Sequence, residues 1–535
     1  MRRRAVHGVV LCMVLGSLAV WPAPGRAAGL AVQFRSDPVP GVEVRGLAAP
    51  GLAVDVGRIG RGAPVRVEAI AAGPIASGVE TTSAVCQRVG GILCVNADFA
   101  ACRTCTTAFG GLVHGGVLQR SPVADHPQLT LGPTGPDAGP LGWGAVLEAT
   151  VTYLDRDPLL GSLLNLPPVE RVEKVSLGLD AVNRPRGANQ VVLFTPPWGA
   201  TTMTPGGGDE AVLGSGAATV GASVPVDPRA LRVGAGATPI PGDGMVVSAE
   251  GGASARLRAF WAKAADPAAA RRSVVLRPSL DRPAQESVGG YPVVLANGQT
   301  MLGGSVDPFV TGRNPRTLVG WNPAGDLLLI TIDGRQPGRS DGASLGEAAD
   351  VLRQVGATSG FNLDGGGSTT FVSLAAGRGR TPQVLNRPSD GTERRVTTVL
   401  AVIPVAGTAV RTSAAPAPPQ PPPAPPGPPP PDPASTDGLP KRPIAPPPTA
   451  PAAPATTATP PPAAPAPPPA LEPTVPVTES QAAALEVALP PPTPASTAAH
   501  RSATAVPAAI AGAALLAVTA ATLRTSRRRT RPRRS

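Results

Sequence analysis

The chain has 535 residues, of which 3% are aromatic, and a formal net charge of +11. This charge suggests a nucleic-acid partner, but eleven arginines in residues 2–26 and 524–534 account for it, and the sequence between them is close to neutral. We therefore predict no nucleic-acid partner and interpret both basic ends as membrane-topology signals.

Residues 1–28 have the three parts of a secretory signal peptide. A positive segment, Arg2–Arg4, precedes the short apolar run Val9–Trp21, and the small residues around Ala27 are typical of a cleavage site. We expect the chain to be exported.

Residues 29–407 are expected to fold as one large catalytic domain of the α+β class, rich in β-structure. Short runs rich in β-branched residues, separated by Gly and Pro, predict strands at Val65–Ile70, Gly91–Asn96, Val191–Thr195, Leu318–Asn322 and Leu327–Asp333. One helix is clearly predicted, because Ser344 and Glu347 form a capping box and Gly356 is a suitable end. Its apolar stripe at helical spacing comprises Leu345, Ala348, Ala349, Leu352 and Val355.

The C-terminal part is predicted to be a linker and an anchor. Residues 408–500 are dominated by Pro and Ala, and a segment of this composition is expected to be disordered. Residues 503–523 lack charge and are just long enough for one transmembrane helix, and the basic residues 524–535 favour a cytoplasmic tail. The expected location is the cell membrane, with a single pass and the catalytic domain outside the cell.

Four cysteines follow the predicted leader: Cys86, Cys94, Cys102 and Cys105. An even number in an exported chain predicts two disulfides, and we favour the pairs Cys86–Cys94 and Cys102–Cys105. A four-thiolate zinc site is the alternative, because Cys102 and Cys105 have the spacing of half of such a site. No cofactor is predicted.

The densest group of functional residue types lies in Phe361–Val372. Asn362 and Asp364 end a predicted strand, Gly365–Gly367 permit a tight turn with exposed amides, and Ser368 adds a hydroxyl. Polar residues also end or follow other predicted strands, at Asn96, Asp98, Asp333 and Arg335, and Arg316 precedes one. Together these groups supply the carboxylates and guanidiniums that a phosphorylated sugar requires.

These segments, in this order, resemble the phosphodiester glycosidase family over about residues 85–403. The segments that carry the resemblance are Asn96–Phe99, Arg313–Thr317, Thr331–Arg335, Asn362–Ser368 and Asn386–Arg394. The resemblance implies a hydrolase that cleaves the glycosidic bond of a sugar-1-phosphodiester, here on a cell-envelope or extracellular glycan.

The resemblance also implies roles for individual residues. Carboxylates that activate water or attack the anomeric carbon are expected among Asp364, Asp98 and Asp333. Substrate and phosphate contacts are expected from Arg316, Arg335, Arg394, Asn362, Asn96, Glu393, Gly365, Gly366, Gly367 and Ser368. Asp333 and Glu393 have the further possible role of orienting the arginines.

Three alternatives are weighed against this interpretation. Gly338–Gly342 matches the nucleophile elbow of serine hydrolases, but no strand leads directly into a helix there, and His114 and His126 are expected in exposed loops. A stalked, non-catalytic glycan-binding protein would need the same linker and anchor. A sugar-phosphate transferase would use the same site with an acceptor hydroxyl in place of water.

Overall fold

The computed structural model describes residues 29–411 except 103, 157–163 and 375–380, and these residues form a β-rich fold with few helices. The predicted leader, linker and membrane anchor lie outside the described residues. In the part of the chain that the structure describes, no helix is long and apolar enough to cross a membrane.

The largest sheet of the site-bearing half has eight antiparallel strands. Their order is β1 (Ala31–Val39), β2 (Val42–Ala49), β3 (Leu52–Ile59), β23 (Leu327–Ile332), β22 (Arg316–Trp321), β24 (Ser359–Asn362), β20 (Val293–Ala296) and β21 (Gln299–Thr300). Strand β23 is apolar throughout because both of its faces are buried. Leu327 and Leu329 enter one core, whereas Leu328, Ile330 and Ile332 enter the other.

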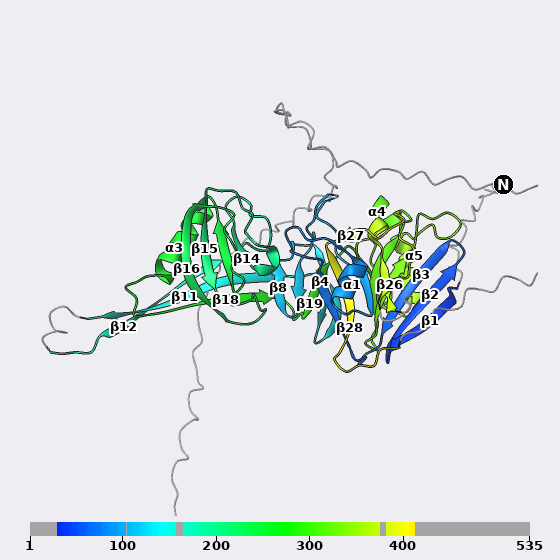
Figure 1. The fold of residues 1–535 in the computed structure, drawn as a ribbon, viewed down its shortest axis with the longest axis horizontal. Helices are drawn as coiled ribbons and strands as arrows, with labels where there is room; N and C mark the ends of the chain where they lie inside the picture. Colours follow the sequence, from blue (N-terminus) through cyan, green and yellow to red (C-terminus); the bar gives the residue numbers. More distant parts are fainter. Residues whose placement is uncertain (1–28, 103, 157–163, 375–380, 412–535) are drawn as a thin grey trace, which may run out of the picture. The chain divides into compact units, whose positions relative to one another are not determined.

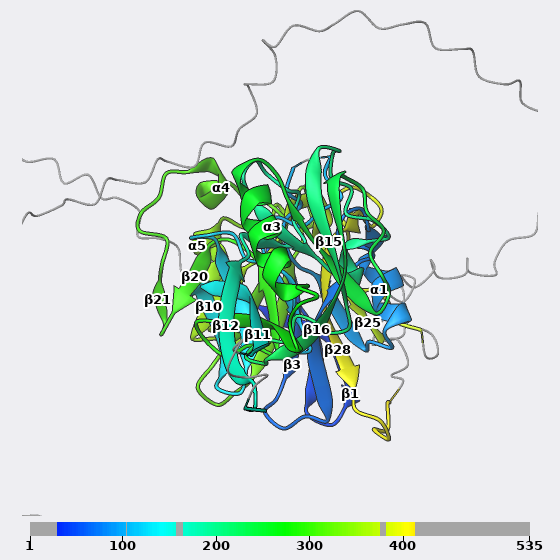
Figure 2. The same ribbon diagram turned by 90° about the vertical axis from the view of Figure 1, so that its left-hand side faces the viewer.

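Helices cover one face of this sheet. Helix α5 (Leu345–Gln354) has the predicted capping box between Ser344 and Glu347, and it packs its buried stripe beside β20 and β24. The short helix α4 (Pro308–Thr311) contacts α5, as Figure 2 also shows. The capping-box prediction is therefore confirmed.

Two five-stranded sheets share the core on the opposite face. The first has the order β26 (Gln383–Val384), β25 (Phe371–Ser373), β6 (Leu93–Asn96), β28 (Thr398–Pro404) and β4 (Val65–Ala71). The second has the order β10 (Gly135–Pro140), β9 (Pro127–Gly132), β19 (Glu286–Gly289), β7 (Leu112–His114) and β8 (Val117–Arg120). A two-stranded sheet joins β27 (Arg395–Val396) to β5 (Glu80–Thr81), next to α1 (Thr82–Arg88).

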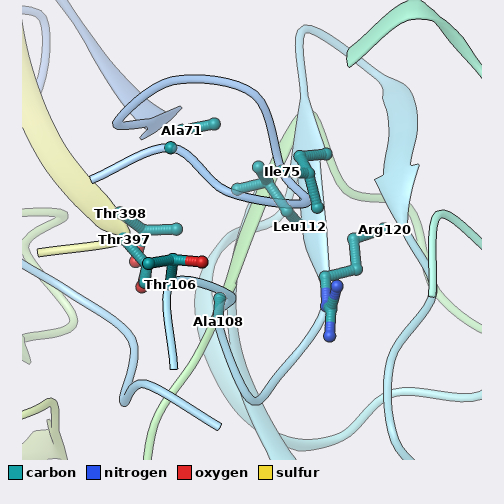
Figure 3. Close-up of a pocket in the computed structure, with 9 residues that line it drawn as sticks. Ala71, Ile75, Thr106, Ala108, Leu112, Arg120, Thr397 and Thr398 are labelled. Carbon is teal, nitrogen blue, oxygen red and sulfur yellow. The ribbon is translucent and has the colours of Figure 1, made fainter. Parts of the chain in front are cut away.

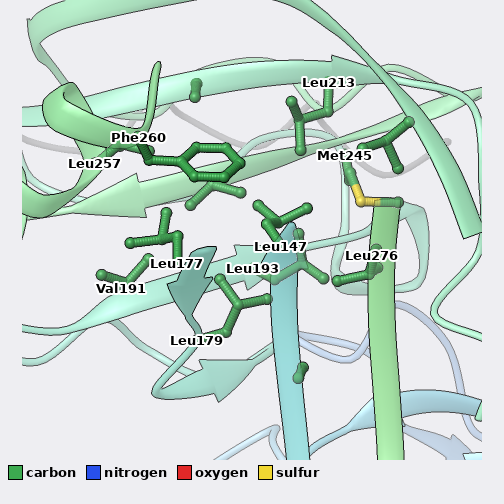
Figure 4. Packing of buried hydrophobic residues seen from close by; sticks show 14 of the residues in the cluster. Leu147, Leu177, Leu179, Val191, Leu193, Leu213, Met245, Leu257, Phe260 and Leu276 are labelled. Carbon is green, nitrogen blue, oxygen red and sulfur yellow. The ribbon is translucent and has the colours of Figure 1, made fainter. Parts of the chain in front are cut away.

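Residues 143–280 are inserted between β10 and β19 and form an eight-stranded sheet with its own core. Its order is β12 (Val169–Gly178), β11 (Trp143–Asp155), β18 (Arg271–Leu280), β16 (Val224–Ala235), β15 (Gly208–Gly214), β17 (Gly244–Ala249), β14 (Val191–Phe194) and β13 (Ala181–Val182). Helix α3 (Gly252–Ala264) lies against β11, β12 and β15 (Figure 1), and its Leu257 and Phe260 belong to the same buried core as Leu147 and Leu193 (Figure 4). The short 3-10 helix η1 spans Pro196–Trp198.

Candidate active site

The site is built where β6 and β24 end and β22 begins. The Asn96 side chain donates to the backbone carbonyl of Asp364 at 2.7 Å, and its Oδ1 accepts from the Thr317 hydroxyl at 2.7 Å and from the Thr370 amide at 3.1 Å. The amide of Asp364 donates to the carbonyl of Ala97 at 2.8 Å. Asn96 is fully buried, so its side chain fixes the loop after β24.

Asp98, two residues after Asn96, is 2% exposed, and its Oδ2 accepts from the amide of Gly110 at 2.7 Å. Its backbone amide donates to the Thr398 hydroxyl at 2.8 Å, whereas Oδ1 has no hydrogen-bond partner among the described residues. Burial raises the pKa of Asp98 to about 7, Arg120 and the Gly110 amide oppose this rise, and the nearby Asp364 adds to it. Asp98 is thus poised to titrate near neutral pH.

Two glycines and two arginines, the buried Arg120 and the partly exposed Arg184, surround the Asp98 carboxylate. A Cβ atom at Gly289 would lie 2.5 Å from Oδ1, and one at Gly110 would lie 2.8 Å from Oδ2, so only glycine fits at either position. Arg120 and Arg184 both donate to the carbonyl of Gly110, at 3.2 and 2.9 Å. Burial lowers the pKa of Arg120 to about 10 and that of Arg184 to about 9.

A small, mainly apolar pocket lies next to Arg120. Ile75 and Leu112 line it together with Thr397 and Thr398, which lie across the pocket from Arg120 (Figure 3). Since the Thr398 hydroxyl also accepts a hydrogen bond from the Asp98 backbone amide, this pocket adjoins the site and is not a separate one.

Asp364 is the second carboxylate and is partly exposed. Burial raises its pKa to about 6, while hydrogen bonds from Ser368 and the Gly365 amide and the positive charge of Arg394 lower it. The negative charge of Asp364 is the smallest contribution to the raised pKa of Asp98, and burial is the largest. With pKa values of about 7 and about 6, both carboxylates change protonation close to neutral pH.

Two arginines near Asp364 form no ion pair with any described carboxylate. Arg316 is 2% exposed, and it donates only to carbonyls, those of Ala343 at 3.0 Å and of Phe309 and Gly312 at 2.8 Å. Burial, with a contribution from Arg335, lowers its pKa to about 10. A buried guanidinium without a counter-ion, next to a second one, favours an anionic ligand.

The glycine-rich loop lets the arginines approach its backbone. Gly366 has φ +60°, and a Cβ atom there would lie 3.2 Å from Nη2 of Arg335. Arg335 also donates to Oδ1 of Asn314 at 2.8 Å. A Cβ atom at Gly367 would collide with Arg394, which binds Asp390 at 2.6 Å. The structure therefore brings together Asp98, Asp364, Arg316, Arg335, Arg394 and the Gly365–Ser368 loop, which contains the 3-10 helix η2 (Gly366–Ser368).

Asp333 is only 2% exposed, and its oxygens are already engaged. Oδ1 accepts from the Asn386 side chain and the Arg387 amide, both at 3.1 Å, and Oδ2 accepts from Arg339 at 3.0 Å. These contacts fix the loop at residues 386–387, so the role that they give Asp333 is structural. Its arginine partner, Arg339, is not among the residues predicted from the sequence.

Glu393 and Asn362 both make hydrogen bonds to other segments of the protein. Glu393 accepts from the amide of Ser83 at 3.0 Å and from its hydroxyl, so its described contacts hold the start of α1 and no arginine. Asn362 donates to the carbonyl of Tyr291 at 2.6 Å, while its buried Oδ1 has no partner among the described residues. Asn362 therefore faces the segment after β19.

The serine-hydrolase alternative is wrong. Ser340 is fully buried, donates to the carbonyl of Asp333 at 2.6 Å and accepts from the amide of Ala53 at 3.1 Å. The segment is a turn closed by a Gln336–Ser340 bridge, not a strand that enters a helix. His114 ends strand β7 and contacts Glu286 at 3.1 Å, which raises its pKa, so its expected loop position is wrong as well.

The predicted disulfides Cys86–Cys94 and Cys102–Cys105 are both confirmed, and the four-thiolate zinc alternative is wrong. In the described ranges no group of His, Cys, Asp and Glu side chains is arranged to hold a metal ion.

Several residues of the site were not found from the sequence: Arg120, Arg184, Gly110, Gly289 and Asn386. Asn386 lies inside a motif that carried the family resemblance, so that signal was present. The two arginines and the two glycines approach Asp98 only through tertiary packing, and no local pattern marks them.

The fold and the cluster define a β-rich protein with interacting carboxylates and uncompensated arginines at strand ends. Residues 226–403 match the family model described as phosphodiester glycosidase, so this part of the chain is similar to that family. The matched range contains Arg316, Arg335, Asp364 and Arg394, but not Asn96 or Asp98.

Comparisons with individual proteins give partial matches. The chain is 43% identical over 74 residues to the N-acetylglucosamine-1-phosphodiester alpha-N-acetylglucosaminidase of Mus musculus and 35% identical over 111 residues to that of Bos taurus. These segments cover 14% and 19% of this chain, and they span only 14% and 19% of the relatives' own length. Among solved structures, a hypothetical protein from Synechocystis has a TM-score of 0.47 at 19% identity, with 70% of this chain and 68% of that chain covered.

Proposed function

We propose that this protein hydrolyses the glycosidic bond of a sugar-1-phosphodiester. The observation that carries the proposal is the pair Asp98 and Asp364, two interacting carboxylates with raised pKa values beside Arg316 and Arg335, which have no described carboxylate partner. Carboxylates can activate water or attack an anomeric carbon, and paired guanidiniums can bind a phosphate.

The proposed mechanism assigns the two ends of the substrate to the two halves of the cluster. Arg316 and Arg335 bind the phosphate, with Arg394 and the loop amides of Gly365–Gly367 as further donors. Because a phosphate monoester is a good leaving group, protonation of the departing oxygen contributes less than the binding of its charge. The ionised member of the carboxylate pair activates water or attacks the anomeric carbon, and the protonated member donates a hydrogen bond.

The proposed setting is the outer side of a membrane, with a cell-envelope or extracellular glycan as substrate. It is supported by the apolar leader, the uncharged segment 503–523 followed by arginines, and the two disulfides, which are typical of oxidising compartments. Alkaline phosphatase fusions after residues 411 and 535 would test the topology. Activity after 411 without activity after 535 is the expected result, and equal activities would refute it.

The direct test is release of reducing sugar and a phosphate monoester from a panel of nucleotide sugars and other sugar-1-phosphodiesters. The proteins compared are the full chain, Asp364→Asn and the control Asp350→Asn, whose carboxylate lies on α5 and pairs with Arg353 at 2.8 Å. We expect Asp364→Asn to be at least about a hundredfold slower and Asp350→Asn to be unchanged.

The other outcomes distinguish the alternatives. If no panel member is cleaved while wild type and Asp364→Asn bind the same glycans equally, the protein is a glycan-binding module. If sugar appears on an added alcohol in preference to water, the same cluster serves a transferase. An activity unaffected by Asp364→Asn refutes the assigned site.

A further inference from the structure

Five ring side chains form a continuous row, which we call the aromatic row: Phe109, His126, Tyr291, Phe309 and Phe99. Ring centroids are 4.7 Å apart from Phe109 to His126, 6.5 Å from His126 to Tyr291, 6.1 Å from Tyr291 to Phe309 and 6.1 Å from Phe309 to Phe99. The row joins segments from four separate parts of the chain. Local sequence therefore cannot explain why the rings meet.

Hydrophobic core formation does not account for the row. The chain has eight phenylalanines and two tyrosines. The other five phenylalanines belong to or pack against the hydrophobic cores, whereas in the row only Phe309 touches a core, at its edge. Tyr291 is 38% exposed, and the other four rings are partly exposed. Partly exposed rings gathered in one place typically mark a binding surface.

The aromatic row lies beside the carboxylate–arginine cluster, next to Asp98 and Arg316. Phe99 is the residue after Asp98, and Phe109 precedes Gly110, which donates to Asp98. Next to Phe99 in the row, the ring centre of Phe309 lies 5.2 Å from the Arg316 guanidinium. A molecule that contacts the row would therefore also reach a carboxylate and the proposed phosphate-binding arginine.

Buried polar atoms beside the row lack partners among the described residues. They are Nε2 of His126, Nε2 of Gln128, Oδ1 of Asn362 and Oδ1 of Asp98. Asn362 is linked to the row through its bond to the Tyr291 carbonyl, and Gln128 lies near Asp98 across Gly110. Burial and the charge of Arg184 lower the pKa of His126 to about 4, so its imidazole is neutral at neutral pH. Such buried atoms require a ligand or water to complete their hydrogen bonds.

We propose that the aromatic row is a pyranose-binding subsite, in which a sugar ring stacks its C–H face on Tyr291 and Phe309 while its hydroxyls bond to Asn362, His126 and Gln128. A sugar offers both an apolar face and hydroxyl groups, and this combination matches rings flanked by unsatisfied polar atoms. A nucleobase would also stack on the rings, but it offers fewer hydrogen-bonding groups to the surrounding polar atoms. The inference rests on the proposed function, since the stacked ring is taken to be the sugar of the phosphodiester.

The test measures binding separately from turnover. Saturation-transfer NMR and calorimetry would be run on the full chain with methyl glycosides of glucose, galactose, mannose and N-acetylglucosamine, and with uridine as the nucleobase probe. Loss of the Tyr291 ring in Tyr291→Ala is expected to raise the Kd for the preferred glycoside about tenfold, and the Kd of Tyr291→Phe is expected to stay within about twofold of the wild-type value. The control Met301→Ala removes a side chain that is 55% exposed and outside the row, and it should bind as wild type does.

The outcomes separate this proposal from the hydrolase assignment. If no substrate is cleaved, but a glycoside binds and Tyr291→Ala lowers its affinity, the proposed subsite is supported and the proposed hydrolase activity is refuted. If substrate is cleaved and Tyr291→Ala keeps the wild-type KM and glycoside affinity, the subsite is refuted and the hydrolase stands. Binding of uridine but of no glycoside would overturn the choice of sugar. Circular dichroism and the thermal midpoint would be recorded for each variant, with Asn362→Ala as a second variant if Tyr291→Ala does not fold.

Discussion

Asp98→Asn is expected to reduce the pH dependence of the unfolding free energy between pH 5 and pH 8. Asp98 has a pKa of about 7 in the folded protein against 3.8 in the unfolded chain, so the folded state holds the proton more tightly. The stability contributed by this protonated group is complete below pH 3.8 and is lost as the pH rises through 7. Between pH 5 and pH 8 the wild type should lose about 3 kcal/mol of unfolding free energy through this group alone.

The asparagine variant keeps the shape and can still accept the Gly110 amide, but it cannot ionise. Its drop in unfolding free energy from pH 5 to pH 8 should therefore be smaller than that of the wild type by about 3 kcal/mol. The variant should be more stable than wild type at pH 8 and yet inactive.

The assay is urea unfolding of the full chain at pH 5, 6, 7 and 8, followed by circular dichroism. Asp350→Asn is the matched control because it also neutralises one aspartate, on the exposed side of α5. If wild type, Asp98→Asn and Asp350→Asn lose stability in parallel over this range, the ionisation of Asp98 carries no folding cost and its proposed role as a poised carboxylate fails.

Three further results are expected. Asn96→Ala leaves three hydrogen-bonding groups at the strand ends without their partner and should lower the unfolding free energy by about 3 kcal/mol; a variant as stable as wild type would contradict the clamp described for this residue. Asp333→Asn should lower the unfolding free energy by about 2 kcal/mol, a modest loss because its partner Arg339 is half exposed. It should leave kcat within about threefold of the wild-type value, and a hundredfold fall in kcat would instead support the catalytic role predicted from the sequence. In mild reductant under native conditions, the more exposed disulfide Cys102–Cys105 should be reduced first, and the fully buried disulfide Cys86–Cys94 should be reduced only after unfolding. Alkylation of the freed thiols followed by mass spectrometry measures both rates, and equal rates would contradict this order.

The sequence alone determined features that depend on local chemistry. Helix α5 follows from its capping box and apolar stripe, because both act between neighbouring residues of one segment. Strand β23 follows from a run of aliphatic residues that can only be buried on two faces. The disulfides follow from four close cysteines, and the similarity to phosphodiester glycosidases follows from motifs that occur in order along the chain.

Only the tertiary structure decided which polar residues meet and with what charge. Asp98 and Asp333 both follow aliphatic strands, yet one keeps an oxygen without a described partner and the other is fully bonded to the loop at 386–387. This difference arises from residues outside the strands that carry the two carboxylates, namely Gly110 and the distant Gly289 beside Asp98, and Asn386 beside Asp333. Burial, close approach and pKa depend on these distant neighbours, so motif residues can be proposed from sequence but their roles require the fold.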